Sequence, residues 1–425
     1  MNITKKMKIY DIIVAGGGFA GTCAAIAAAR RGKKVLLVER YNALGGAAVY
    51  DLVNPFMKYF TWDSDRRMIL LSDGIFTEIR EKMAELGGMR QGDFHNFNEE
   101  YLKLVLNRMC IEAGVNLLFN TVITGASAEN GKISTVTVYN VSGTSALGAK
   151  YFIDCTGDGN LAELAGFGFN VGRETDSLCQ PMTLCFRISG TDAETINANR
   201  GEINRIYREL QEKGEITNPR EDVLIFRTLV NGIIHFNTTR IVKLDPTDGE
   251  SVTKAEIEAR EQVFEIVRML KNNFECFKNI ELISTGIQIG ARESRMIDGI
   301  YRLEKEEICG FAKFPDGVCA CNYDIDIHSP DGSGTSHWLF PEGEYYTIPY
   351  RCLVPKKSKN LLVAGRCISV SHEVQASIRI MPVCASMGEA AGTAAALALE
   401  TGVDVGNVNT VLLRKSLAEA GAFVG

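Results

Sequence analysis

The sequence predicts an α/β protein whose parallel, Rossmann-like sheet is divided by an inserted domain. A strand, a glycine turn, a helix and a second strand follow one another over residues 9–40. A further buried strand of the parallel type stands far along the chain, at 361–365. The stretch from about 170 to 350 lacks this alternation of strands and helices and contains most of the prolines. A chain of 425 residues has room for two or three domains, so nucleotide-domain sequence at both ends indicates one split domain.

The first unit has the sequence pattern of a βαβ crossover. A β-branched run at 9–15 leads into a glycine turn at 16–21. An alanine-rich helix then ends near Arg30, and a second apolar strand covers 34–39. Parallel strands need such a crossover, and a helix is the usual way to make it. We therefore expect these residues to begin the parallel sheet.

Other helices and strands are predicted from the periodicity of apolar residues and from the capping and turn residues that bound them. Helices are predicted over 72–86, with Ser72 as the N-cap, and over 99–113. Residues 132–155 hold two β runs separated by 142–148, which predicts an antiparallel excursion. The middle of the chain adds strands at 223–229 and 232–242 and an amphipathic helix at 254–270. The predicted divisions are a nucleotide-binding first part at 1–170, an inserted α+β substrate or cap domain at 171–345 (with 285–300 returning to the first domain), and a last part at 346–425.

A late helix, from about 382 to 399, is rich in small residues. Because small side chains recur at three- and four-residue spacing, we expect its face to pack closely against the first helix. The residues concerned are Gly388, Ala391, Gly392 and Ala395 on the late helix and Gly21, Ala24, Ala25 and Ala28 on the first.

Composition excludes several classes of protein. The net charge is −6, so the chain lacks the basic footprint of a nucleic-acid binder. Twelve cysteines without a CxxC pair indicate free thiols in a reducing compartment. Lys5, Lys6 and Lys8 precede an apolar run too short for a signal peptide, and no stretch predicts a membrane span, so we expect a cytoplasmic protein. Asp326 and His328 alternate with Asp324, but three ligands on one short strand converge poorly, so no metal site is predicted.

The strongest motif is Gly16-x-Gly18-x-x-Gly21. It follows a predicted strand and opens a helix, the context in which glycines let a backbone approach a diphosphate. Glu39 ends the next strand, where a carboxylate reaches the ribose hydroxyls of an adenosine. These residues predict a dinucleotide site.

Arg40 and the pair Gly45-Gly46 follow directly. An acidic residue, a basic residue and a glycine pair in this order resemble the FAD-binding oxidoreductases of the glutathione-reductase structural superfamily. A second block, Thr156-Gly157-Asp158 after an apolar strand, resembles that superfamily's second FAD motif. An alternative interpretation takes Gly157, Gly159 and Ala162 as a nucleotide finger for NAD(P)H.

A third block runs from the strand that delivers Gly365 and Arg366 to the helix that starts at Pro382. Together the blocks resemble the FAD-dependent oxidoreductases related to fumarate reductase and succinate dehydrogenase flavoproteins. The resemblance implies FAD, and Ala47 after the glycine pair, with neither a CxxxxC pair nor a histidine there, implies non-covalent binding without a dithiol relay. The cofactor residues it implies are Gly16, Gly18, Phe19, Ala20, Gly21, Glu39, Arg40, Gly45, Gly46, Ala47, Val122, Thr156, Gly157, Asp158, Gly365, Arg366, Met381 and Pro382.

Three residues are predicted to carry the chemistry. His372 and Arg379 lie between a cofactor strand and a cofactor helix, and relatives of fumarate reductase use such a pair to hold a substrate carboxylate. Arg292 belongs to a charged cluster with Glu293 and Arg295. Histidine titrates near neutrality, which suits proton transfer.

The predicted function is an FAD-dependent dehydrogenase or reductase. It would transfer a hydride between FAD and a small polar metabolite, with carboxylates among the candidates. The alternatives are an NAD(P)H-dependent flavin reductase and a flavin-carrying subunit that passes electrons to a redox partner protein. Neither nucleic acid nor a membrane span belongs to any of these hypotheses.

Overall fold

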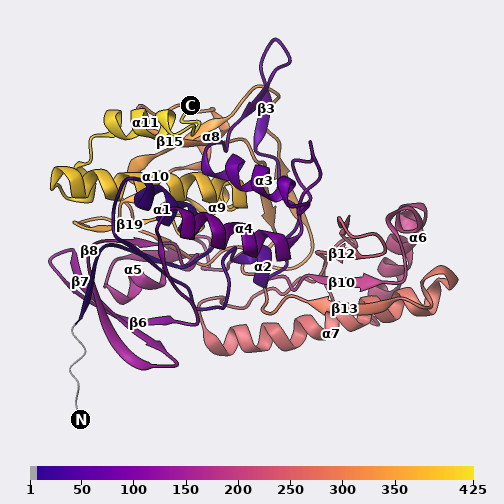
Figure 1. The fold of residues 1–425 in the computed structure, drawn as a ribbon. Helices are drawn as coiled ribbons and strands as arrows, with labels where there is room; N and C mark the ends of the chain where they lie inside the picture. Colours follow the sequence, from indigo (N-terminus) through magenta and orange to yellow (C-terminus); the bar gives the residue numbers. More distant parts are fainter. Residues whose placement is uncertain (1–6) are drawn as a thin grey trace.

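The computed structural model describes residues 7–425, so Lys5 and Lys6 lie outside the described residues. Its main sheet has the order β5-β2-β1-β8-β7-β6, with β19 paired to β8. Strands β6, β7, β8 and β19 of this sheet are labelled in Figure 1. Five of its strands run parallel, as predicted, because the crossovers between them return the chain to the same edge. The parallel strands are β1 (Lys8–Ala15), β2 (Val35–Val38), β5 (Asn116–Leu118), β8 (Gly143–Asp154) and β19 (Leu361–Val363).

The predicted antiparallel excursion is present, but its internal boundary was wrong. β6 (Val122–Glu129), β7 (Lys132–Asn140) and β8 form a meander, and residues 143–148, assigned to the connection, belong to β8. They form strand because Leu147 pairs with both Lys8 and Val136, so each of its neighbours supplies ladder bonds. The turn is confined to the residues before Gly143, which has a φ of +87°.

Helices α1 (Phe19–Arg30), α3 (Ile75–Glu85), α4 (Glu99–Glu112) and α10 (Met381–Thr401) pack with this sheet in one core. The helix predicted at 72–86 begins later, at Ile75, and Ser72 is not its cap. The buried carboxylate of Glu389 on α10 accepts a hydrogen bond from the Ile75 N–H at 3.0 Å. A side chain from another helix therefore takes the place of a local N-cap.

The contact between α1 and α10 confirms the predicted small-residue packing. A Cβ added at Gly388 would lie 2.0 Å from the backbone oxygen of Ala20, and one at Gly392 would lie 2.1 Å from that of Ala24. The two backbones are thus close enough that only glycine fits at these two positions.

A second sheet, in the order β11-β12-β10-β13, forms a second unit together with α6 and α7, and this unit lies beside the unit that contains the main sheet (Figure 1). Its own hydrophobic core is drawn from residues between Met182 and Ile289. Residues 317–349, which the sequence assigned largely to the insertion, pack instead in the main core. The predicted boundaries stay a prediction, and the separate cores favour an insertion that ends near residue 290. The elements of this unit are β10 (Phe186–Ser189), α6 (Ala193–Glu212), β11 (Ile225–Arg227), β12 (Ile234–Phe236), α7 (Gly249–Asn273) and β13 (Glu281–Thr285).

The remaining elements connect or cover these two units. They are α2 (Ala47–Tyr50), β3 (Phe60–Trp62), β4 (Met68–Leu70), α5 (Asn160–Leu164), β9 (Phe169–Val171), β14 (Arg295–Ile297), α8 (Lys305–Cys309), β15 (Gly317–Cys321), β16 (Ile325–His328), β17 (Thr335–Trp338), β18 (Tyr346–Pro349), α9 (His372–Ile378) and α11 (Thr410–Glu419).

Within residues 7–425, no single helix has both the length and the apolar character to cross a membrane. The pair α9 and α10 passes that test only when taken together, across a 95° bend. Most of α10 is buried in the core of the protein.

Candidate active site

One cavity lies at the carboxyl ends of β1, β2, β8 and β19, where the glycine turns meet. It contains about 1200 Å³ of space, part of it open to solvent. Ligands of open α/β sheets bind at this edge. The predicted cofactor residues that line it are Gly16, Gly18, Phe19, Ala20, Glu39, Arg40, Gly45, Gly46, Ala47, Val122, Thr156, Gly157, Gly365, Arg366 and Met381.

The glycine turn after β1 is shaped by close backbone contacts. Gly16 has a φ of +92°, and a Cβ there would lie 2.5 Å from the backbone oxygen of Cys155. Gly21 does not line the cavity, because it packs so tightly that a Cβ would lie 1.8 Å from the Gly16 oxygen. No side chain caps α1, which starts right after Gly18. Its free N–H groups therefore suit a diphosphate.

Glu39 directly follows β2 and lines the cavity. Its carboxylate accepts hydrogen bonds from the backbone N–H of Gly17 and, at 2.9 Å, of Tyr41. Burial raises its pKa, while these two hydrogen bonds oppose that rise. The arrangement fixes a carboxylate where the ribose hydroxyls of an adenosine would lie.

A second close backbone contact lies between the turn that contains Gly18 and the pair Gly45-Gly46. Gly46 has a φ of +53°, and a Cβ there would lie 2.9 Å from the Cα of Gly18. Such a cradle is open to an extended ligand only because both positions lack side chains.

Arg366 lines the cavity and is held by Asp158. Its Nη2 donates to Asp158 Oδ1 at 3.0 Å, and Ser294 Oγ donates to the same oxygen at 2.8 Å. Asp158 therefore orients Arg366 and does not itself line the cavity, and Pro382 does not line it either. Nη1 of Arg366 is buried without a hydrogen-bond partner among the described residues, which leaves a charged donor for a ligand. Glycine cradle, ribose carboxylate and free arginine donor together fit FAD.

Sequence reasoning missed several residues of this cavity. Two of them are Asp51 and Gln288, and the Gln288 Nε2 donates to Asp51 Oδ1 at 2.8 Å. Asp51 follows the glycine pair by five residues and interrupts an apolar stretch. A charged residue at such a position could have been recognised from the sequence as a candidate site residue. Gln288 comes from a distant segment and offered none. The other missed lining residues are Val38, Tyr41, Tyr50, Thr121, Ile123, Cys155, Asn160, Leu161, Ala364 and Cys384.

Of the two predicted arginines, Arg379 lines the cavity and Arg292 does not, although Arg292 is near enough to Arg379 to be affected by its charge. Arg379 lines the cavity, lies 3.6 Å from Asp326 and has a buried Nε without a partner among residues 7–425. Arg292 donates through Nη1 to the oxygen of Pro181 and to Thr183. Desolvation, with Arg379 nearby, lowers the pKa of Arg292 to about 9. Asp326 pairs with Arg379, and no carboxylate among residues 7–425 forms an ion pair with Arg292.

His372 lies apart from the cavity. Its Nδ1 is 2.8 Å from Glu293 Oε1, in a buried pair. One turn further along α9, Gln375 donates to the backbone oxygen of Arg292 at 2.7 Å. Helix α9 therefore holds the segment that carries Arg292.

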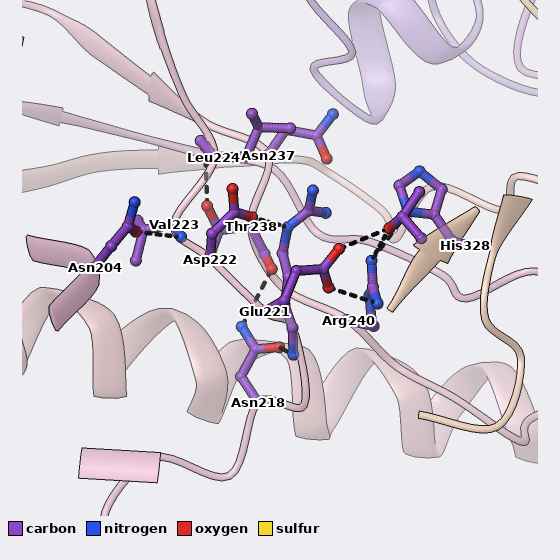
Figure 2. A network of polar contacts seen from close by, with 12 residues as sticks. Asn204, Asn218, Glu221, Asp222, Val223, Leu224, Asn237, Thr238, Arg240 and His328 are labelled. Atoms are coloured by element: carbon purple, nitrogen blue, oxygen red, sulfur yellow. Dashed lines mark hydrogen bonds and ion pairs between the residues drawn. The ribbon is translucent and has the colours of Figure 1, made fainter. Parts of the chain in front are cut away.

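Figure 2 shows the polar network that links the second unit to the main one. Arg240, 1% exposed, pairs with Glu221 at 3.0 Å and donates to His328 Nδ1 at 3.0 Å. His328 in turn lies 3.4 Å from Asp326, whose pKa is held well below its usual range despite burial, because His328, Arg379 and Arg292 face it. Burial lowers the pKa of His328 to about 3, so its ring is neutral. Across the described part of the chain, no group of three or more His, Cys, Asp or Glu side chains has an arrangement that could hold a metal ion.

The sequence profile of the family described as FAD dependent oxidoreductase matches residues 11–417. The chain belongs to that family. It is 32% identical over 140 residues to a digeranylgeranylglycerophospholipid reductase of Methanocella arvoryzae, covering 30% of this chain and 34% of that protein. A protein of the same name from Methanoculleus marisnigri is 26% identical over 197 residues, covering 44% and 46%. The matched regions thus span between about a third and a half of these relatives.

Among solved structures, the chain resembles a geranylgeranyl bacteriochlorophyll reductase-like protein of Thermoplasma acidophilum. The TM-score is 0.49 at 13% identity, over 98% of this chain and 85% of that one. Family membership confirms two predictions made from the sequence: the protein is an enzyme, an oxidoreductase, and its cofactor is FAD.

Proposed function

We propose that this oxidoreductase transfers a hydride between FAD and a small polar metabolite that bears a carboxylate. The observation that carries the proposal is the position of Arg379, which lines the FAD cavity and has an unused buried donor. Arg292 adds a second cation beside it. A guanidinium binds a carboxylate with two parallel hydrogen bonds, which fixes both its position and its orientation.

Bound FAD would supply the hydride acceptor or donor. The chain supplies orientation and charge. Asp326 and its partner His328 hold Arg379 from one side, and α9 holds the backbone of Arg292 from the other. A substrate carboxylate bound by Arg379, with Arg292 nearby, would be fixed at one end of the cavity, and positioning of this kind contributes much of the rate enhancement of enzymes.

The cofactor would be held without a covalent bond. The glycine turn at Gly16–Gly21 and Arg366 would take the diphosphate, and Glu39 would take the adenosine ribose. The uncapped N-terminus of α10, at Met381, would place its dipole near the flavin ring. Ala47 and Ala48 follow the glycine pair, where neither has a side chain that could attach to a flavin. The predicted branch, near fumarate reductase, stays a prediction.

We assign His372 to positioning. Its partner Glu293 is 0% exposed and also accepts the backbone N–H of Gln180 at 2.8 Å. The pair ties α9 to the segment that carries Arg292. The catalytic role predicted for His372 from the sequence stays a prediction, and the distinction is tested below.

We also place the protein in the cytoplasm, because its cysteines are free thiols. A redox partner protein would be needed only if no small molecule exchanges electrons with the flavin.

The test is to expose the purified flavoprotein, without oxygen, to panels of hydroxy acids and unsaturated acids while its visible spectrum is recorded. We expect a carboxylate to reduce the bound flavin, or to reoxidise it after chemical reduction. Rapid bleaching by NADH or NADPH alone would favour the flavin-reductase alternative. A response only to isoprenoid lipids, the substrates named for the two relatives, would overturn the proposal.

A further inference from the structure

Asp51 stands at an unusual position for a carboxyl group. It follows α2, lines the FAD cavity and is 7% exposed. Its Oδ1 accepts the hydrogen bond from Gln288, while among residues 7–425 its Oδ2 accepts none and no ion pair within 4.0 Å reaches it. A buried carboxylate that makes one neutral hydrogen bond is poorly compensated.

The charged and titratable groups that face this carboxyl come from several elements. Arg366, after β19, and Arg40, after β2, favour its ionised form, while Asp158, after β8, opposes it. Cys185, before β10, and Tyr41 also face it, both with raised pKa values and therefore neutral. Burial outweighs the two arginines and raises the pKa of Asp51 to about 7.

The same cavity must accept the diphosphate of FAD, which carries two negative charges near neutral pH. Arg40 and Arg366 line the cavity, so a bound diphosphate would share the cations that now support an ionised Asp51. The added negative charge would also oppose that ionisation directly. We propose that Asp51 contacts bound FAD as a neutral carboxylic acid, so that FAD binding takes up one proton from solution.

The direction of the pH effect follows from linkage. Below the pKa of Asp51 in the FAD-free protein the group is already neutral, and FAD affinity does not change through it. Above that pKa a proton must be bound with each FAD, so the dissociation constant rises by up to about tenfold per pH unit. Glu39 acts in the opposite sense, since its ionised form binds ribose and is lost as the pH falls.

The experiment dilutes the FAD-loaded protein from pH 6.5 to 8.5 and reads released FAD by its fluorescence. We expect the dissociation constant to rise by about tenfold per pH unit above about 7 in the wild type, and by less than twofold over the whole range in Asp51→Asn. Glu389→Gln is the matched control. Its carboxyl is also buried, with a pKa raised by burial to about 7, but does not line the cavity, so it should keep the wild-type slope.

An equal slope in Asp51→Asn, or a flat wild-type profile, would overturn the proposal. If Asp51→Asn does not fold, Gln288→Met replaces it. That change removes the hydrogen bond to the ionised carboxyl, so the pH at which affinity begins to fall must move upward. An unmoved break contradicts the proposal. No substrate is present, so the result is independent of the proposed carboxylate substrate.

Discussion

The two halves of the candidate active site differ in composition: backbone groups form one half and charged side chains form the other. The half that we propose binds FAD consists largely of backbone: glycine turns, uncapped helix ends and helices α1 and α10 in backbone contact. The half that faces the second unit consists of long charged side chains, in which Arg240, Arg292 and Arg379 hold and are held by carboxylates and carbonyls. A backbone site is fixed by packing and has little room for variation. A side-chain site is adjustable, so specificity is expected to reside there.

A large effect on stability is expected at the α1–α10 contact. In Gly392→Ala the new Cβ would lie 2.1 Å from a backbone oxygen of α1, so the helices must move apart. Such overpacking costs about 1–3 kcal/mol or more, above the roughly 1 kcal/mol that alanine gains in a helix. Denaturant unfolding measures it.

The control is Gly201→Ala in α6 of the second unit, where a Cβ meets nothing within 4 Å. That substitution should stabilise by about 0.5–1 kcal/mol, the helix-propensity gain alone. If both substitutions changed stability in the same direction, the contrast between the two regions would fail.

Glu389 is the exception in the backbone half, a carboxyl 2% exposed on α10. Burial raises its pKa to about 7, above the ordinary value of 4.5, so the folded protein binds a proton that the unfolded chain has lost. Folding stability should therefore fall as the pH rises from about 4.5 to 7, by on the order of 3 kcal/mol through this group. In Glu389→Gln that part of the pH dependence should disappear from urea-unfolding curves, and an unchanged slope would show that the group stays ionised.

Arg240 tests the side-chain half. Arg240→Met keeps the length of the side chain but removes the bonds to Glu221, His328 and the carbonyls of Gly332 and Gly334. Because Glu221 is partly exposed and can be hydrated again, we expect a loss of about 2 kcal/mol, smaller than for a fully buried pair. Arg205→Met, which breaks the exposed ion pairs with Glu202 and Glu209 on α6, should cost less than about 1 kcal/mol in the same assay. Equal losses would mean that burial adds nothing at Arg240.

His372 gives the smallest expected effect. If it positions Arg292, His372→Gln should raise KM for the carboxylate several-fold, keep kcat within a few-fold and leave FAD bound. Loss of kcat with an unchanged KM would restore the catalytic role predicted from the sequence. The readout is steady-state kinetics across pH, since loss of a proton-transfer group would also remove a limb of the profile.

The sequence predicted the backbone half in detail because glycine spacing and small-residue spacing are local patterns. Gly16, Gly46 and Gly392 each stand where a side chain would collide, and this requirement is visible in the chain itself. Gln288 and Arg240 gave no such signal, because their partners Asp51 and His328 are far away in the sequence. The start of α3 was misplaced for the same reason: its cap, Glu389, lies 314 residues beyond Ile75.

The central claim is that Arg379 binds a substrate carboxylate beside FAD. The direct measurement is a titration of the wild-type flavoprotein and Arg379→Met with small carboxylates, monitored by the flavin difference spectrum. The account predicts a saturable spectral change in the wild type that weakens at least about tenfold in Arg379→Met, with FAD content unchanged. Equal carboxylate affinity in both proteins would contradict it.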